Sequence, residues 1–214
     1  MSAHDLLRVV ADRGIQEILH FTTNRGLTGT LASRTLKSRA RLPEDRYLEY
    51  IFEPNALLRK DLDWLDYVNL SISAINGRFF DVCESKWHVG EDIFWVVLAF
   101  DPVILAHDGV VFTTTNNMYT GVHRDKDTAG LLALFDESIT RWTSNAVRRP
   151  GELDRHMPTD EQAEVLYPGE LSTRYLRTIY APSAHAHDLA CAQLKIFPHE
   201  DVKVIIDPLL RRRN

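Results

Sequence analysis

The spacing of hydrophobic positions along the chain changes several times and predicts an alternation of helices with short strands. Apolar residues three or four positions apart predict helices at 4–13, 24–36, 127–138 and 183–194. Gly14 is placed to end the first of these helices, and Ser183 is a candidate N-cap for the last. Apolar and β-branched runs predict strands at 17–22, 66–75, 92–102, 109–117, 163–168, 175–182 and 202–207.

Two long stretches interrupt this pattern. Residues 37–60 are charged and marked by prolines, and residues 141–162 are polar and irregular, so we expect both to be long surface loops. Loops of this length in a compact domain are usually functional or disordered. The pattern as a whole predicts an α+β fold with a mixed sheet of short strands, peripheral helices, and one domain over residues 1–214.

Composition narrows the class of protein. The 214 residues carry a formal net charge of -5, which argues against a surface that is basic throughout but leaves room for a local basic groove. Two cysteines, Cys83 and Cys191, are too few for a disulfide framework and have no zinc-site spacing. The start lacks a signal-peptide pattern, and no apolar run is long enough to span a bilayer. We therefore expect a cytoplasmic protein with no membrane partner.

Common catalytic motifs are missing from the sequence. "GLTGT" lacks the third glycine and the lysine of a phosphate-binding loop, and neither GxSxG nor HExxH occurs. His185 and His187 would point to different faces of a helix, so they do not form a helical metal pair, and we expect no metal site.

Several polar residues remain, and each taken singly has an ordinary explanation. His20 stands inside an apolar strand, Asn116 lies in a turn, Arg59 precedes a strand, and Glu164 opens the run "EVLYP" after a proline-punctuated loop. Most such residues serve packing, turns or solvation. A charge run such as Arg148, Arg149 in an exposed loop is usually just solvated.

The order of these blocks carries a family resemblance. "LHFT", "GLTGTLASRTL", an arginine ahead of "DYVNLSIS", "FTTTNN" before "GLLALFD", and "DEQAEVLYPGEL" follow one another from about His20 to Tyr180. Together they resemble the DarT family, NAD-dependent ADP-ribosyltransferases that modify bases of single-stranded DNA. Members are usually toxins encoded beside a macrodomain antitoxin. The resemblance therefore implies an ADP-ribosyltransferase-like fold, NAD as co-substrate and a DNA acceptor.

The resemblance also assigns residues. It implies a catalytic role for Glu164 of "QAEVL" and for Arg59, which also binds NAD, with Lys60 and Arg46 as alternatives for the arginine. The other implied NAD contacts are His20, Thr22 and Ser71, and the implied DNA contacts are Trp142, Arg148, Arg149, Arg155 and Asn116. Residues 143–162 would then be the loop that reads the acceptor. The block "VNLSISAINGRFF" is closer to a branch with S-I-x-x-x-N, which leaves guanine or an RNA base open beside thymine.

These residue types suit the chemistry that the resemblance implies. Loss of nicotinamide leaves positive charge on the ribose, which a carboxylate stabilises in a site that excludes water. The same carboxylate can take the proton of the attacking base. Arginine pairs well with a pyrophosphate, and a neutral histidine could donate to a ribose hydroxyl. Transfer to RNA or protein, hydrolysis of NAD by water, and a non-catalytic nucleic-acid-binding module stay open.

Overall fold

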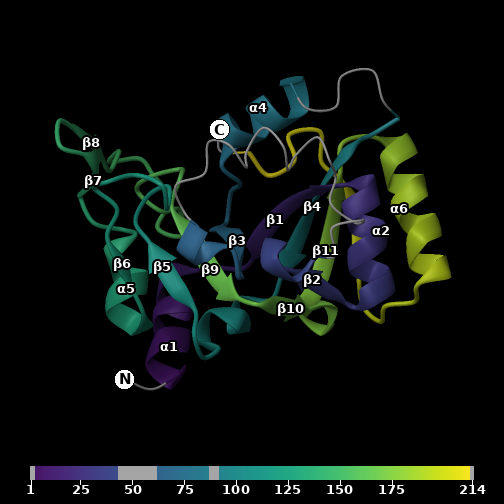
Figure 1. Ribbon diagram of the computed structural model, residues 1–214, viewed down its shortest axis with the longest axis horizontal. Coiled ribbons are helices and arrows are strands. Elements are labelled where there is room, and N and C mark those ends of the chain that lie inside the picture. The colour runs from purple at the N-terminus through teal and green to yellow at the C-terminus, as the bar shows by residue number, and fades with distance from the viewer. Residues whose placement is uncertain (1–2, 43–61, 87–91, 213–214) are drawn as a thin grey trace.

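The structure is a computed structural model that describes residues 3–42, 62–86 and 92–212. Its centre is an eight-stranded mixed sheet in the order β12-β11-β4-β1-β3-β9-β5-β6 (Figure 1). The strands are β1 (Ile18–Thr23), β3 (Tyr67–Ile72), β4 (Trp95–Phe100), β5 (Val111–Thr113), β6 (Arg124–Asp125), β9 (Glu164–Pro168), β11 (Leu176–Ala181) and β12 (Lys203–Ile206). Neighbours are antiparallel except for the parallel pair β11 and β12.

The helices and two small ribbons surround this sheet. The helices are α1 (Ala3–Arg13), α2 (Asn24–Ser33), α4 (Gly77–Lys86), α5 (Asp127–Ala133) and α6 (Ala184–Ile196). Strands β2 (Thr35–Lys37) and β10 (Glu170–Ser172) form one ribbon, and β7 (Ser138–Trp142) and β8 (Asn145–Arg148) form the other. Within the described residues, none of the helices has the length and hydrophobicity needed to cross a membrane.

The α+β class and the predicted order of elements are confirmed, with corrections at particular segments. The helix predicted over 24–36 ends earlier because Arg34 adopts a left-handed conformation with φ of 56°, after which β2 begins. Helix α4 was not predicted. The prediction that 141–162 is irregular throughout is wrong, because the β7–β8 hairpin extends to Arg148. Within the helix predicted over 127–138, which ends at Ala133, Leu132 is exposed, while Leu134 just beyond α5 is buried.

Both faces of the sheet are covered, which explains why all six residues of β4 are buried. The larger core packs α1, α2 and α6 against one face and includes Leu27, Leu31 and Leu98. A smaller core on the other face holds Phe80 of α4 against Trp95 and Val97. The sheet is thus the middle layer of the molecule.

The sheet is nearly divided between β1 and β3. Strand β1 pairs with β4 along six residues, but with β3 only through Ile18–Ile72 and Leu19–Ser71. Beyond Leu19 the two strands no longer share a backbone ladder, so two half-sheets meet at a short junction. One half-sheet is β12-β11-β4-β1 and the other is β3-β9-β5-β6.

The segment after β12 closes the smaller core. Leu210 is 2% exposed within this core, whereas its neighbour Leu209 is 55% exposed. The guanidinium of Arg212 lies over the ring of Phe80 and pairs with Asp81 at 3.0 Å on α4. The segment therefore fixes α4 against the sheet.

We expect Leu210→Ala to lower the free energy of unfolding by roughly 2–5 kcal/mol, because it removes buried surface and leaves a cavity. Leu209→Ala is the matched control, and its exposed side chain should cost less than about 0.5 kcal/mol. Urea unfolding followed by circular dichroism measures both. Equal effects of the two substitutions would show that this segment is not part of the core.

Candidate active site

Glu164 is the first residue of β9, between β3 and β5, and its side chain is half-buried. Its carboxylate Oε2 accepts a hydrogen bond of 3.0 Å from the backbone N–H of Asn117. Its own backbone N–H donates to the hydroxyl of Thr113 at 3.2 Å. Two neighbouring segments thus fix the backbone and the carboxylate of this residue.

Three consecutive threonines, 113–115, build the support around this glutamate, and all are buried. The Thr113 hydroxyl accepts from the backbone N–H of Glu164, and the Thr114 hydroxyl accepts from the backbone N–H of His123. The Thr115 hydroxyl donates to the carboxylate of Asp160. The sequence block "FTTTNN" contains this run, but we had selected only Asn116 from it. The residue that contacts the glutamate is its neighbour Asn117, which sequence reasoning missed.

His20 lies in the part of β1 where the ladder to β3 has ended. Its Nδ1 is 3.0 Å from the carbonyl oxygen of Asn69 on β3, so the side chain joins the half-sheets in place of a backbone bond. Burial lowers the pKa of His20, and the smaller effect of the Asn69 hydrogen bond raises it, so the ring is neutral at pH 7. Because a carbonyl can only accept, the proton is on Nδ1, and Nε2 is an acceptor. The expectation that His20 donates to a ribose hydroxyl is therefore wrong for this tautomer, because the proton of the neutral ring already faces the Asn69 carbonyl.

Strand order brings several of the assigned residues to one region. Ser71 pairs with Leu19 on one side, and extending the ladder from Leu70–Val165 by one residue puts Ser71 opposite Glu164. Strands β1, β3 and β9 are adjacent in the sheet (Figure 1). His20 and Ser71 lie on the two strands of the junction, and Glu164 lies on β9, one strand beyond it.

Thr22 lies near the end of β1, just before α2. A Cβ added at Gly26 would stand 2.0 Å from the Thr22 hydroxyl oxygen, so this hydroxyl lies against the first turn of α2. Arg59 lies outside the described residues, as do the alternatives Lys60 and Arg46.

Trp142 lies at the end of β7 and is 39% exposed. Its ring meets Tyr119 edge to face with centroids 5.0 Å apart, and the Tyr119 hydroxyl donates to the Gln162 side-chain oxygen at 2.9 Å. Gln162 is two residues ahead of Glu164. The predicted stacking residue is therefore linked to the β9 rim through two contacts.

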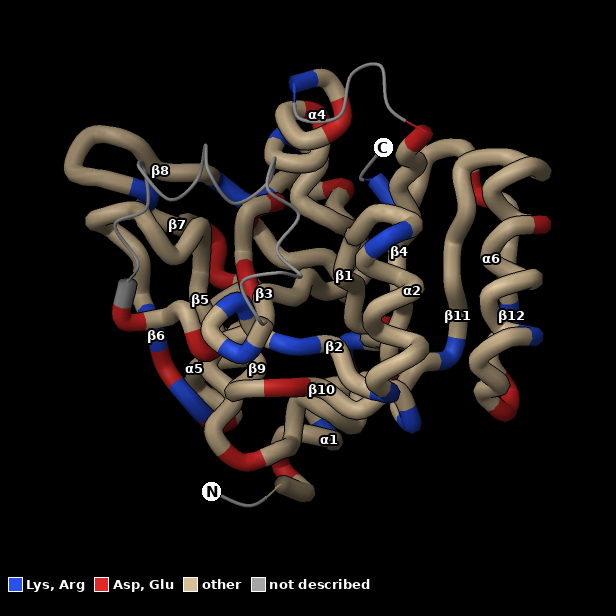
Figure 2. The backbone as a smooth tube through the Cα atoms, turned by 45° about the vertical axis from the view of Figure 1, so that its right-hand side comes forward, with Lys and Arg blue, Asp and Glu red and all other residues tan. Residues whose placement is uncertain are grey.

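The other assigned DNA contacts lie in different settings. Arg148 is exposed on β8, whereas Arg149 donates to the carbonyls of Met157 and Asp154, both at 2.9 Å, and so organises the following loop. Arg155 donates to the Asp12 carbonyl of α1 at 2.9 Å. The Asn116 side chain accepts from the Met118 N–H within the turn. Their contacts with DNA stay predictions. Basic and acidic positions are interleaved over the chain, with several basic ones around β2 and the β7–β8 hairpin (Figure 2).

A buried ion pair anchors the loop that leads to Glu164. The Arg141 guanidinium holds Asp160 through two hydrogen bonds, of 2.8 and 2.7 Å. Burial acts to raise the pKa of Asp160, but hydrogen bonds from Arg141, Thr115 and the Gln162 N–H together bring it below its usual value. The bidentate pair thus ties β7 to the residues just ahead of β9.

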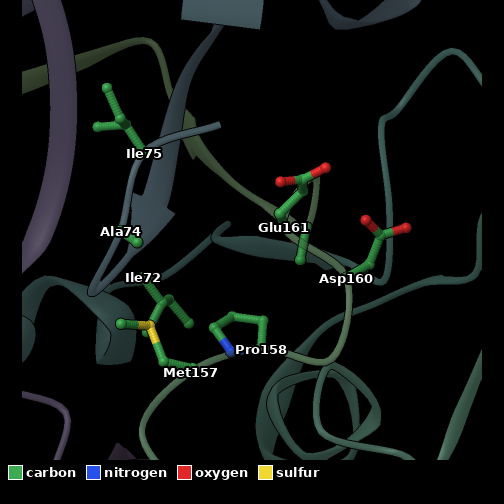
Figure 3. Close-up of a pocket in the computed structure, with 8 residues that line it drawn as sticks. Ile72, Ala74, Ile75, Met157, Pro158, Asp160 and Glu161 are labelled. Atoms are coloured by element: carbon green, nitrogen blue, oxygen red, sulfur yellow. The ribbon is translucent and has the colours of Figure 1, made fainter. Parts of the chain in front are cut away.

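The same loop packs against the end of β3. Met157, Pro158 and Glu161 face Ile72, Ala74 and Ile75 around a cavity of about 10 Å³ (Figure 3), which has room for about one water molecule. Glu161 also pairs with Arg78 of α4 at 2.6 Å. This contact region is closely packed and therefore holds the loop in place.

The sheet carries a half-buried glutamate at the rim of β9 and, on β1 with β3 between them, a histidine that joins the two half-sheets, and these are the residue types that the resemblance to ADP-ribosyltransferases implies. The sequence model of the family described as "ssDNA thymidine ADP-ribosyltransferase, DarT" matches residues 19–211. The chain therefore belongs to the DarT family. The family, fold and enzyme class expected from the sequence are confirmed.

Solved structures agree on the fold. Thermus sp. 2.9 DarT in complex with NAD+ matches with a TM-score of 0.64 and 18% identity, covering 90% of this chain and 96% of that one. The same protein in complex with ADP-ribosylated ssDNA gives 0.65 and 16%, with 91% and 95% covered. Thermosipho africanus DarTG in complex with ADP-ribose gives 0.58 and 15%, covering 91% of this chain and 51% of that one. A search of curated proteins returned no match.

We expect Asp160→Asn to destabilise the protein by roughly 3–5 kcal/mol at pH 7, because it leaves the buried Arg141 without its charge partner. The pKa of Asp160 is lowered on folding, so its stabilising contribution is complete above the unfolded pKa of about 4 and is lost as the pH falls through the folded value. The difference between wild type and variant should therefore shrink in acid.

Urea unfolding at pH 7 and at a series of acid pH values measures this difference. Asp66→Asn is the matched control, since the Asp66–Arg41 pair at 2.7 Å is solvent-exposed and its loss should have a small effect. A difference for Asp160→Asn that stays constant down to pH 2 would contradict the assigned role.

Proposed function

We propose that this enzyme transfers ADP-ribose from NAD to a nucleobase of single-stranded DNA, with Glu164 as the catalytic carboxylate. The observation that carries the proposal is the placement of Glu164. It is half-buried at the rim of β9, its Oε2 is fixed by the Asn117 N–H, and β3 beside it carries the carbonyl that holds His20. A preorganised anion at this point suits a reaction in which positive charge develops on a sugar.

The reaction balances without another reagent. The bond between the ribose C1′ and the nicotinamide nitrogen breaks, and its electron pair leaves with nicotinamide, which becomes neutral. A ring nitrogen of the base forms the new bond to C1′ and loses its proton to Glu164. The carboxylate therefore acts first as an electrostatic stabiliser and then as a general base, a role worth about 10²–10⁴-fold.

The residues of the first half-sheet suit the binding of NAD. His20, neutral and with its proton on Nδ1, accepts a ribose hydroxyl at Nε2 and adds no charge beside the developing cation. Thr22 on β1 and Ser71 on β3 supply hydroxyls from the same two strands. The pyrophosphate is assigned to Arg59 by resemblance, with Lys60 and Arg46 as alternatives, because a planar guanidinium forms paired bonds with phosphate oxygens.

Trp142, Tyr119 and Arg148 suit the binding of a single strand. An exposed indole offers a stacking face for an unpaired base, and an exposed arginine can contact the backbone. We assign the reading of the acceptor to residues 143–162 together with this group, with Arg149 and Arg155 shaping the loop.

We take thymine as the target base, following the family description, with guanine and RNA bases as the alternatives to test. The Asn of the S-I-x-x-x-N block is Asn76, whose side chain accepts from the Phe79 N–H and caps α4. This structural role accounts for the asparagine without any base preference. Mass spectrometry of defined DNA and RNA oligonucleotides after incubation with NAD identifies the acceptor. Label appearing in protein alone would reject the assignment to nucleic acid.

We further propose that the enzyme acts as the toxin of a toxin–antitoxin pair, with a macrodomain protein as its partner. A relative carries the name DarTG, and reversal of ADP-ribosylation is what a macrodomain partner would supply. The proposal is tested by expression in a bacterial host with and without a macrodomain hydrolase. Equal growth in the two cases, with the enzyme expressed and active, would reject it.

Glu164→Gln should lower transfer to single-stranded DNA by at least about 10³-fold, because the amide neither stabilises the cation nor takes the proton. The control is Glu170→Gln, which changes an exposed glutamate on β10 and should leave transfer unchanged. Release of nicotinamide and modification of an oligonucleotide are measured together. Wild-type turnover by the Glu164 variant would overturn the catalytic assignment, and binding of DNA without turnover by wild type would support the non-catalytic module.

Gly26→Ala should weaken the binding of NAD by roughly tenfold or more, because its Cβ would displace the Thr22 hydroxyl from the first turn of α2. Gly29→Ala in the same helix has no atom within 4 Å of its added Cβ, so it should bind NAD normally and be slightly more stable. Calorimetric titration with NAD measures both. Equal affinities would show that Thr22 does not contact NAD.

A further inference from the structure

Asn117 is held from two sides beside the catalytic carboxylate. Its backbone N–H donates to Glu164, while Arg124 donates through Nε to the Asn117 side-chain oxygen and through Nη2 to its backbone oxygen, both at 2.5 Å. Arg124 is itself supported by β6 and by the ring of Trp64, 5.5 Å away. The position of this asparagine is therefore strongly constrained.

Arg124 also fixes the orientation of the amide. A guanidinium has no acceptor, so the amide atom that faces it must be the oxygen. The amide nitrogen, Nδ2, then points elsewhere as a donor. A flipped amide would place two donors against each other and leave the Arg124 Nε without its acceptor.

This donor has no partner among the described residues, although Asn117 is 3% exposed. Buried donors without partners are uncommon in proteins because they cost free energy. The described residues contain six buried side-chain polar atoms without a hydrogen-bond partner: two are acceptor oxygens, in Asn24 and Gln193, and four can donate, in Asn117, Thr128, Arg211 and Arg212. The one in Asn117 belongs to a residue that contacts Glu164, so it is the one to consider at the site.

Strand order decides which substrate lies near this donor. The proposed NAD contacts are on β1 and β3, on one side of β9, whereas Asn117 follows β5 on the other side. Two residues further along, Tyr119 contacts Trp142, the proposed stacking face for the base. The donor therefore lies on the acceptor side of Glu164.

We propose that the Asn117 side-chain amide donates a hydrogen bond to a carbonyl oxygen of the acceptor base and so helps to select it. Thymine, cytosine and guanine carry such an oxygen, and adenine does not. The inference rests on the proposed function and deepens it. Because the donor is covered in the unliganded chain, the bond forms once an extruded base has entered the site. A base without the carbonyl would leave the donor buried and unpaired.

Two substitutions distinguish the proposed hydrogen bond to the base from the contacts that Asn117 makes with Arg124 and Glu164. Asn117→Asp keeps an oxygen for Arg124 and the backbone N–H for Glu164, but replaces the donor by an acceptor. Asn117→Ala removes the donor without adding charge. Both should lower kcat/KM for a thymine-containing oligonucleotide by roughly tenfold to hundredfold, while the affinity for NAD, measured by calorimetry, stays within twofold of wild type.

The decisive experiment combines the variants with altered bases. In oligonucleotides whose one target thymine is replaced by 2-thiothymine or 4-thiothymine, a sulfur takes the place of the carbonyl oxygen at C2 or at C4. Sulfur accepts hydrogen bonds less well than oxygen. In wild type, one of these replacements should lower the rate of transfer relative to the thymine oligonucleotide. In Asn117→Ala, which already lacks the donor, the same replacement should lower the rate of transfer only slightly. If Asn117 had a purely structural role, the thio replacement would lower transfer by the same factor in wild type and in Asn117→Ala.

The outcomes separate this inference from the function on which it rests. Absence of transfer to DNA by wild type would reject the proposed function itself. With wild type active, three results would overturn the role of Asn117: unchanged transfer by both variants, a matching loss of NAD affinity, or a loss confined to the charged Asp variant. Melting curves of each variant, superimposable on that of wild type, confirm that the comparison is made between folded proteins.

Discussion

The proposed chemistry of this enzyme depends on holding one carboxylate, that of Glu164, at the rim of a sheet. Glu164 opens β9 between β3 and β5, and it is paired by the ladder on one side only, with Thr113 of β5, because the β3–β9 ladder ends at Leu70–Val165. The Thr113 hydroxyl and the Asn117 N–H extend this fixation from the backbone to the side chain. A group held in this way loses little entropy when the charge that it stabilises develops, which is the basis of electrostatic preorganisation.

The firm attachment of Glu164 to β5 and the following turn contrasts with the short junction between β1 and β3. Two residue pairs and the His20 side chain join the half-sheets there. Beyond these two pairs, the only side-chain hydrogen bond described between β1 and β3 is that of His20 to the Asn69 carbonyl. On the acceptor side, the buried Arg141–Asp160 pair and the Arg78–Glu161 pair hold the loop that enters β9. Both sides of the site are thus built from segments distant in sequence.

Elements with strong periodicity were predictable from the sequence, and the remainder were not, for identifiable reasons. The run 95–100 reads as a buried strand because both of its faces are apolar. The β7–β8 hairpin was missed because one of its inward positions is Arg141, whose partner Asp160 lies 19 residues away. Nothing in local polarity distinguishes such a buried arginine from a solvated one. Helix α4 was missed because its buried residues, Phe80 and Cys83, are too few to mark a face.

The candidate site was assigned from the family resemblance and not from hydrophobic spacing, and its residue roles stay predictions. His20 and Glu164 were assigned on that basis, and the structure places them on β1 and β9, on either side of β3. The choice between Asn116 and Asn117 could not be made from the sequence, because either could close the turn. The structure decides it, because the backbone N–H of Asn117 donates to the Glu164 carboxylate, whereas the Asn116 side chain accepts from Met118 within the turn. The same limit applies to the direction of the His20 hydrogen bond, which depends on a carbonyl of another strand.

The His20 imidazole has a consequence for the mechanics of the sheet. A neutral ring that donates at Nδ1 and accepts at Nε2 is polarised along its length, so each hydrogen bond strengthens the other. A hydroxyl bound at Nε2 would therefore shorten and stiffen the bond from Nδ1 to the Asn69 carbonyl. Under the proposed binding mode, NAD bound at Nε2 would therefore strengthen the contact between the two half-sheets.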